Sequence, residues 1–397
     1  MIISPIKMDF KSANPSSVVP PNISTFNSYT FDRNILVPAS AFRFTAPGVE
    51  KSLRTSIRSG DTVSLYATNS KGIKAPIGTG FIDETDTHIM PNNVEYVLTG
   101  RDTLGQLVDN ASVDDKNNII NVEKADMLMI LGTLIKNTRI PEGVVPSQTP
   151  NGQFLFQTNP GESKINALQR YMEFTNCLVW TLPDGRITIG KPNFTQIKKG
   201  SLRLLSDGIN NNLLEARVRR NINQAIRQIV TQLQTMDQVY AGTYTKNNDD
   251  KDIKPFLSSL IGRSVYNHFS YGQGQDMVNT VTGVGNQSAI PRKIGDELSL
   301  RYIARDNMKI LDVEAVVEGH LNEFGDVYNI DQIYNVQIDD DDLFEDMYVY
   351  ACTYDLTMDH GMITRLKLCR LGTICAYADV LQRTAENFGG GTFGNIA

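Results

Sequence analysis

Hydrophobic and polar residues alternate along many short runs of this chain, and that period is typical of a β-strand with two differently used faces. Between residues 28 and 99 the runs NILVPASAFRFT, DTVSLYAT, PIGTGFID and VEYVLT are separated by Gly, Pro, Asn and Asp. This spacing predicts a small all-β barrel or sandwich. Near the other end, the runs ILDVEAVVEGHL, YNIDQIYNVQI, MYVYACTYDL and MITRLKLCRL predict a second β unit.

The period lengthens at the tripeptide Gly100-Arg101-Asp102. Before it, residues 94–99 alternate as a strand; after it, Leu104, Leu107, Val108 and Ala111 have the i, i+3, i+4, i+7 spacing of one helix face. Gly100 supplies a flexible corner, and Asp102 or Thr103 caps the helix by accepting a backbone N–H. We therefore interpret the tripeptide as a structural joint, because an Asp at a helix start is far more often a cap than a catalytic group.

Helical periods dominate the next segment. The stretch VEKADMLMILGTLIKN, residues 122–137, predicts an apolar helix, and INALQRYMEFT, residues 165–175, predicts a second one. The second helix leads into CLVWTL and RITIG, which flank Pro183-Asp184-Gly185, a specific hairpin signal. Trp180 is the expected core anchor of this α+β insert.

Three segments have weaker patterns. Residues 213–234 suit two strands or a helix, and periodicity alone leaves both open. Residues 236–290 are polar and rich in Gly, Asn and Tyr, which favours a long irregular excursion, with a helical piece at 294–305. The first 25 residues favour an extended arm, and the glycine-rich end AENFGGGTFGNIA a tail ordered only by another chain.

Composition narrows the class of protein. The chain has 397 residues, 41% of them hydrophobic and 21% charged, as in globular proteins of two to four domains. A formal net charge of −6 gives no basic footprint, so sequence-specific nucleic-acid binding is disfavoured. The start carries no signal-peptide pattern and no run is long enough to span a bilayer, which predicts cytoplasmic synthesis without membrane insertion.

Candidate chemistry is sparse. The acidic run at residues 339–346 lacks the ligand spacing of a calcium loop and favours a solvated acidic loop. The glycine pairs do not form GxGxxG, and His88, His268, His320 and His360 are scattered, without HExxH or GxSxG. The four cysteines, Cys177, Cys352, Cys369 and Cys375, show no metal spacing and are expected to be reduced and structural. We therefore expect no catalytic, cofactor-binding or metal-binding residues and no cofactor.

The order of these segments resembles one family. From YVLTGRDTLGQLVDNA, through INALQRYMEFTNCLVWTLPDGRITIGKP, to LLEARVRRNINQAIRQIVTQLQ and the final β unit, the chain is similar to the baseplate hub proteins of contractile phage tails, of the bacteriophage Mu type. That family is related to the hub of T-even phages and to the amino-terminal region of VgrG proteins. The resemblance covers roughly residues 28–235 and 290–372.

The resemblance implies a β-rich α+β multidomain fold with two similar β-barrel domains, and it makes residues 213–234 two strands joined by a short turn. Together with the patterns described above, it gives an arm at 1–25, a first barrel at 26–111, an α+β insert at 112–204, a second barrel at 205–235 and 307–375, an excursion at 236–306 and a tail at 376–397.

The implied function is mechanical. Hub proteins of this family are homotrimers whose two similar domains per chain present a nearly sixfold ring to the tail tube, while the other side meets the threefold central spike. The implied partners are the tube protein or tube initiator, the spike and other baseplate proteins, around a channel for DNA. The implied location is the virion tail baseplate, assembled in the host bacterial cytoplasm.

Two alternatives stay open. One is the corresponding hub of a phage-tail-like injection system or a type VI secretion system. The other, from a different class, is a β-rich hydrolase with carboxylates of residues 339–346 at its site.

Overall fold

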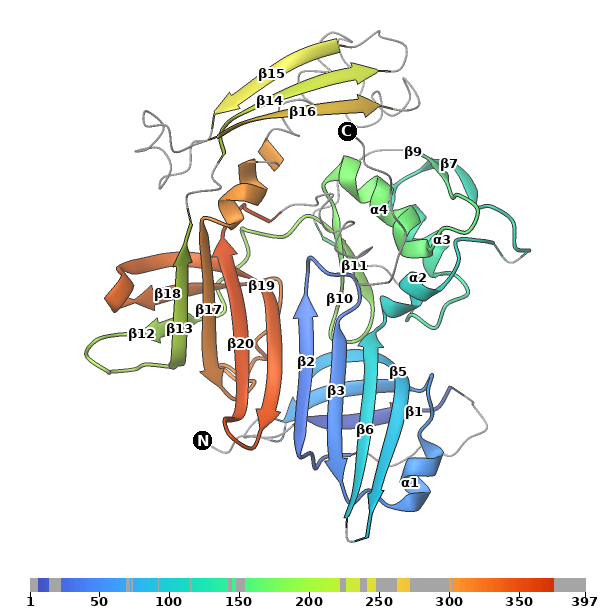
Figure 1. Cartoon of the computed structure of the whole chain (residues 1–397), viewed down its shortest axis with the longest axis vertical. Coiled ribbons are helices and arrows are strands. Elements are labelled where there is room, and N and C mark those ends of the chain that lie inside the picture. The colour runs from blue at the N-terminus through green and yellow to red at the C-terminus, as the bar shows by residue number, and fades with distance from the viewer. Residues whose placement is uncertain are drawn as a thin grey trace.

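The computed structural model describes residues 6–13, 23–68, 72, 74–91, 93–114, 116–141, 145–147, 154–221, 226–235, 241–247, 263–271, 300–301 and 303–374. One large sheet dominates these residues, with the α+β insert beside one end and a separate small sheet beyond it (Figure 1). No helix in the described part of the chain is long and apolar enough to cross a membrane.

A first β unit forms one half of the large sheet. Its strands are β1 (Lys7–Lys11), β2 (Ser28–Asn34), β3 (Ala41–Pro47), β4 (Thr62–Thr68), β5 (Lys74–Met90) and β6 (Asn93–Asp102), with the short helix α1 (Lys51–Ser56) between β3 and β4. They pair antiparallel in the order β1-β4-β5-β6-β3-β2.

A second β unit forms the other half. Its elements are β12 (Ser201–Leu204), β13 (Leu213–Arg220), β17 (Leu311–Glu318), β18 (Gln332–Ile338), the 3-10 turn η2 (Asp339–Asp341), β19 (Leu343–Thr357) and β20 (Gly361–Arg370). All four strand-like runs expected near the C-terminal end are confirmed. Strands β18-β19-β20-β17-β13 pair antiparallel, and β12 adds to β18 in parallel.

The same strand order therefore occurs twice. In chain order, β2, β3, β4, β5 and β6 take the same places as β13, β17, β18, β19 and β20. The longest strand is the fourth of the five in both units, and it carries a bulge just after its pairing with the preceding strand ends: at Ile82/Glu84 in β5 and at Val349/Ala351 in β19.

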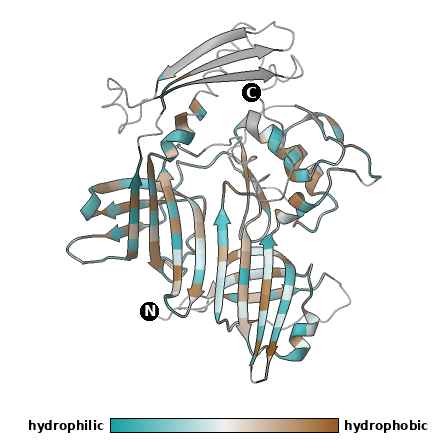
Figure 2. Ribbon diagram, in the orientation of Figure 1, coloured by the Kyte–Doolittle hydropathy of each residue, from teal (hydrophilic) through white to brown (hydrophobic). Residues whose placement is uncertain are grey.

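The alternation that predicted these strands is visible along them (Figure 2). In β17, for example, Leu311, Val313 and Ala315 are buried while Asp312 and Glu314 are half-buried. The inward faces of both units belong to one hydrophobic cluster, and Trp180 is buried in it as well. Trp180 is thus a core anchor, but it anchors the insert to the large sheet.

The insert packs its own smaller core. Its elements are α2 (Gly105–Asp109), β7 (Asn121–Ala125), α3 (Met127–Ile135), β8 (Val145–Pro146), β9 (Phe154–Gln157), α4 (Lys164–Thr175), β10 (Leu178–Thr181) and β11 (Ile187–Gly190). The hairpin at Pro183-Asp184-Gly185 is confirmed, with Gly185 at φ +86°. The long helix expected over 122–137 is wrong in its first third, because Asp126 caps α3 by accepting from Met129 N and the preceding residues pair as β7.

Three further expectations are corrected. Within the arm, residues 7–11 form β1, because Met8 and Phe10 bury their side chains in the large core while the backbone pairs with β4. Only β13 of the two strands at 213–234 joins the large sheet. The other, β14 (Ile226–Thr235), pairs with β15 (Ala241–Asn247) and β16 (Arg263–Tyr271) in a separate sheet, so the excursion has regular structure.

The expected β-rich class is confirmed, whereas the two expected barrels are not. The large sheet runs from β1 at one end to β13 at the other, and no pairing among the described residues closes either unit into a barrel. Residues 300–301 and 303–308 are helical, within or next to the helical piece expected at 294–305. The expected tail lies outside the described residues.

Candidate functional site: the joint between the β units and the two open edges

The two β units meet through one strand pair. Strand β2 of the first unit pairs antiparallel with the second half of β19, from Asn34 opposite Ala351 to Tyr29 opposite Leu356. Twelve backbone-bonded strands thereby become one continuous sheet within a single chain. The joint is therefore a strand-edge contact, the kind of contact that also joins separate protein chains.

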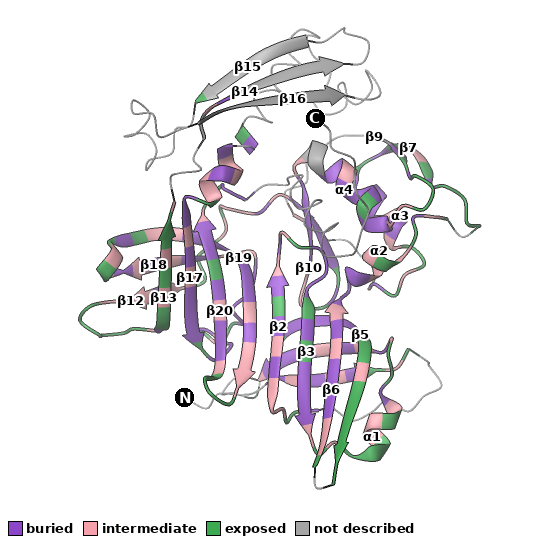
Figure 3. Ribbon diagram, viewed as in Figure 1, coloured by how far each residue is buried: buried purple, intermediate pink, exposed green. Residues whose placement is uncertain are grey.

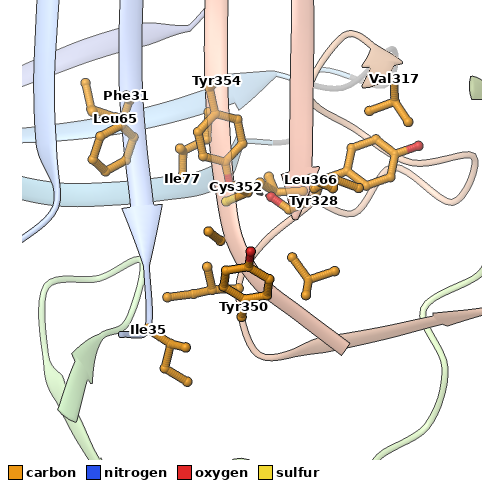
Figure 4. Close-up of a cluster of buried hydrophobic side chains, with 14 of the residues drawn as sticks. Phe31, Ile35, Leu65, Ile77, Val317, Tyr328, Tyr350, Cys352, Tyr354 and Leu366 are labelled. Atoms are coloured by element: carbon orange, nitrogen blue, oxygen red, sulfur yellow. Dashed lines mark hydrogen bonds between the residues drawn. The ribbon is translucent and has the colours of Figure 1, made fainter. Parts of the chain in front are cut away.

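Aromatic side chains fill the joint on its buried face. Phe31 of β2 stacks on Tyr354 of β19 with ring centroids 5.9 Å apart, and both are buried among side chains of the two units (Figure 4). The Tyr354 hydroxyl donates to the carbonyl of Tyr328. Burial raises the pKa of the Tyr354 phenol well above its usual range, so it stays a neutral donor.

A buried histidine crosses the joint. The Tyr29 hydroxyl of β2 lies 2.6 Å from Nε2 of His320, and Nδ1 of His320 lies 2.8 Å from Oγ1 of Thr364 in β20. Because the Thr364 hydroxyl donates to the Gly319 carbonyl, it accepts from Nδ1–H, and Nε2 then accepts from Tyr29. Burial lowers the pKa of His320 to about 3, so the ring is neutral at ordinary pH.

A buried arginine ties three parts of the chain together. Arg33 of β2 donates to the Ile77 carbonyl at 2.9 Å, to Oδ1 of Asn329 at 2.6 Å and to the Thr181 carbonyl of the insert. Only 1% of its surface is exposed. A guanidinium fork can serve three acceptors at once from a fixed position, so Arg33 fixes the insert against both β units.

The tripeptide 100–102 lies at the end of β6. Gly100 is a strand residue, and a Cβ built there would lie 2.2 Å from the Phe81 carbonyl oxygen and 2.4 Å from Cζ of Phe42. The expected flexible corner is therefore wrong: glycine is needed for close packing. Arg101 forms ion pairs with Asp83 at 2.7 Å and Asp109 at 2.6 Å, and these two carboxylates raise its pKa.

Asp102 links the strand to the insert. One carboxylate oxygen accepts from Leu104 N at 3.1 Å, and the other from the Thr181 hydroxyl at 2.9 Å. The N-cap residue of α2 is Leu104, without a side-chain cap, and the Thr103 hydroxyl donates to the Gly185 carbonyl. The expected cap is thus corrected to a backbone contact just ahead of the helix. Burial raises the pKa of Asp102, and its hydrogen bonds and Arg33 oppose that rise.

Two strand edges at opposite ends of this arrangement are open. The second half of β5, residues 83–90, pairs with β6 on one side, and no described strand pairs with its other side. Strand β13 pairs with β17 and has no described strand on its far edge. Both segments are mostly exposed, whereas the matching half of β19, covered by β2, is buried or half-buried (Figure 3).

The acidic run at 339–346 is a short 3-10 turn followed by the start of β19, and several of its carboxylates have partners. Asp339 accepts from Ser206 N, Asp341 pairs with Arg220, and Asp346 pairs with Lys198 at 3.0 Å. The Asn335 amide, and then Lys198, hold the pKa of Asp346 below its usual range. The expected solvated loop is therefore met only at residues 339–342, because residues 343–346 belong to β19.

The remaining candidate residues lie apart. Among the described residues, no three His, Cys, Asp or Glu side chains gather as metal ligands would. His88 is exposed on β5, and His360 lies in the turn before Gly361, which has φ +69°. Cys177, Cys352 and Cys369 are buried free thiols. Cys375 and the side chain of His268 lie outside the described residues.

Sequence reasoning missed the residues that make the joint. Tyr29, Arg33 and His320 come from segments 291 residues apart at their widest, and hydrophobic period alone carries no long-range pairing. The signal was a polar residue, Arg33, within the alternating run SYTFDRN, at a position on the buried face.

Solved structures share this fold. A tail protein of Neisseria meningitidis MC58 superposes with a TM-score of 0.70 at 16% identity, covering 93% of this chain and 98% of that chain. The 43 kDa tail protein of prophage MuSo2 from Shewanella oneidensis gives a TM-score of 0.68 at 16% identity, covering 93% and 99%. No protein-family model and no curated protein matches the sequence.

A third similar structure comes from a secretion machine. It is an E. coli protein described as a component of the type VI secretion system with structural similarity to the bacteriophage T4 tail proteins gp27 and gp5 (TM-score 0.52, 8% identity, 92% of this chain and 77% of that chain). The expected resemblance to phage tail and hub-like proteins is confirmed at the level of the fold.

Proposed function

We propose that this chain is the structural hub of a contractile phage tail baseplate. In this proposal three copies form a ring that adapts the sixfold tail tube to the threefold central spike and surrounds the channel through which DNA passes. The protein acts by shape and contact and is not an enzyme. Its place is the tail of the virion, after assembly in the cytoplasm of a bacterial host.

The repeated strand order is the observation that carries this proposal. A ring of three identical chains offers three equivalent surfaces, whereas a hexameric tube offers six. A chain with two units of the same strand order, β4-β5-β6-β3-β2 and β18-β19-β20-β17-β13, supplies two comparable surfaces per copy. Three copies then present six.

The joint supports a rigid role. The two units share one hydrophobic cluster, and buried polar contacts of Arg33 and His320 cross between them. Units fixed in this way keep a constant angle, which a ring needs in order to close after a definite number of copies. In this proposal the insert, the excursion and the tail are the parts of the chain that contact other baseplate proteins, the tube and the spike.

The hub of a phage-tail-like injection system or a type VI secretion system is the second candidate. The likeness to the E. coli secretion component favours it, because one fold serves both kinds of machine. The two candidates share the same ring and differ in what passes through it. The hydrolase reading has less support, since the carboxylates of residues 339–346 are engaged by Ser206, Arg220 and Lys198.

Electron microscopy of the purified protein tests the proposal. Averages viewed down the axis should show a closed ring of threefold symmetry with six similar lobes and a central opening. Isolated single chains, or pairs, at concentrations used for assembly would contradict the hub.

A further inference from the structure

The two open edges have the same places in their sheets as the two strands of the internal joint. We propose that β13 of one copy pairs antiparallel with the second half of β5 in the next copy, so that the contact between copies repeats the β2–β19 joint. This inference rests on the proposed ring and names the surface that closes it.

The bulges fix which residues of β5 correspond to β19. In β5 the extra residue is Asp83, and in β19 it is Tyr350, at the same point relative to the following strand. Counting onward, residues 84–89 take the places of residues 351–356. These six residues of β19 are the ones that β2 covers.

Strand β13 corresponds to β2 by the same logic. In the first unit, Phe31 lies opposite Phe42, and Phe42 lies opposite Gly100. Gly100 in turn lies opposite Ile82, the residue just before the β5 bulge. In the second unit, Val218 lies opposite Val313, and Val313 lies opposite Leu368. Leu368 in turn lies opposite Val349, the residue just before the β19 bulge. Val218 therefore takes the place of Phe31.

These two equivalences give one register. Phe31 faces Tyr354 in the internal joint, so Val218 faces Thr87 of the next copy. One step along, Arg219 faces Asp86. Ala216 then faces Ile89, a side chain that is 70% exposed in the single chain.

Charge on the two edges fits this register. Arg217 and Arg219 are exposed on one face of β13, and Glu84 and Asp86 are exposed on the matching face of β5. None of these four side chains forms an ion pair with another described residue of the same chain. In the proposed pairing Arg219 lies opposite Asp86 and diagonal to Glu84, within reach of opposite-charge contacts across strands.

The same charges select the direction of assembly. Two β13 edges would place arginines against arginines, and two β5 edges carboxylates against carboxylates, which is unfavourable between neighbouring strands. Charged edge strands avoid unwanted pairing in this way. The β13-to-β5 contact places Arg219 opposite Asp86, and such a head-to-tail contact produces a ring when its rotation closes.

Charge exchange tests the pairing. Arg219→Glu alone, or Asp86→Lys alone, should raise the concentration at which the ring dissociates by about tenfold, since a favourable pair becomes repulsive at every contact. The double variant should recover most of that loss. Lys116→Glu, on an exposed loop of the insert, is the control, and it should leave the dissociation concentration measured by sedimentation unchanged.

Cysteine cross-linking tests the register. Mixing a Val218→Cys chain with a Thr87→Cys chain should give disulfide-linked pairs under mild oxidation. Mixing Arg217→Cys with Thr87→Cys should not, because a shift of one residue turns the side chain to the other face. The buried native thiols of Cys177, Cys352 and Cys369 serve as an internal background, measured on the unsubstituted chain.

The possible outcomes distinguish a failure of the proposed strand pairing from a failure of the proposed hub function. A ring that assembles normally, yet gives no 218–87 cross-link and ignores the charge changes, would overturn the strand pairing and leave the hub intact. A chain that forms no ring would overturn both. Cross-linking at 218–87 together with rescue by the double variant supports the pairing.

Discussion

Close backbone packing, and not flexibility, explains glycine at position 100. Its strand lies so near β5 that any Cβ would overlap the Phe81 carbonyl and the Phe42 ring. The sequence indicated a special position, because a glycine interrupts the strand pattern just before a helical one. It could not indicate the reason, which depends on Phe42, a residue 58 positions earlier in the chain.

Gly100→Ala should lower the free energy of unfolding by about 1–3 kcal/mol, as expected for overpacking. Gly132→Ala in α3 is the matched control, since a Cβ there meets nothing within 4 Å and alanine should raise stability by about 0.5–1 kcal/mol. Urea unfolding curves of both variants measure the difference. Equal effects at the two sites would refute the packing account.

His320 makes the joint sensitive to acid. In the unfolded chain a histidine takes up a proton below pH 6.5, whereas burial holds the folded pKa at about 3. The unfolded state then binds more protons, so this contribution to stability is complete above pH 6.5 and is lost as the pH falls toward 3.

His320→Gln isolates that contribution. The stability gap between the unsubstituted chain and this variant should narrow by about 1.4 kcal/mol between pH 7.5 and 5.5. Denaturant titrations at both pH values measure the gap. A stability gap that is independent of pH would mean that the imidazole of His320 takes up its proton at the same pH in the folded and the unfolded protein.

At the scale of elements, strands were easier to predict than their partners. The runs of β17 to β20 are all strands, although residues 347–352 of β19 are buried on both faces. The helix expected over 122–137 failed at its start because β7 pairs with β9, about 30 residues later in the chain. Strand pairing of that kind is decided by tertiary contacts, which a local period does not contain.

Arg33, which connects the insert to both β units, is the residue whose replacement should lower stability most. Arg33→Met would leave the carbonyls of Ile77 and Thr181 and the amide of Asn329 without their donor, costing about 3 kcal/mol or more. Arg43→Met, at an exposed position on β3, should change stability by less than about 0.5 kcal/mol. Thermal unfolding of the two variants compares them, and similar melting temperatures would show that Arg33 does not hold the insert to the sheet.

For the whole molecule, duplication is the central feature. The sequence predicted two β units and an α+β insert, and both are present. It did not predict that β2 and β19 fuse the units into one sheet, because that contact joins strands more than 300 residues apart. Nor did it separate β14 from the second unit, since the two strands on either side of residues 222–225 have similar patterns.

The mass of the assembly in solution tests the central claim most directly. If two like units per chain make a six-lobed ring, native mass spectrometry of the purified protein should show one dominant species of three chain masses. Dilution should yield single chains without a stable pair, because a head-to-tail pair leaves two open edges. A chain that stays single at every concentration, or stops at two copies, would contradict the account.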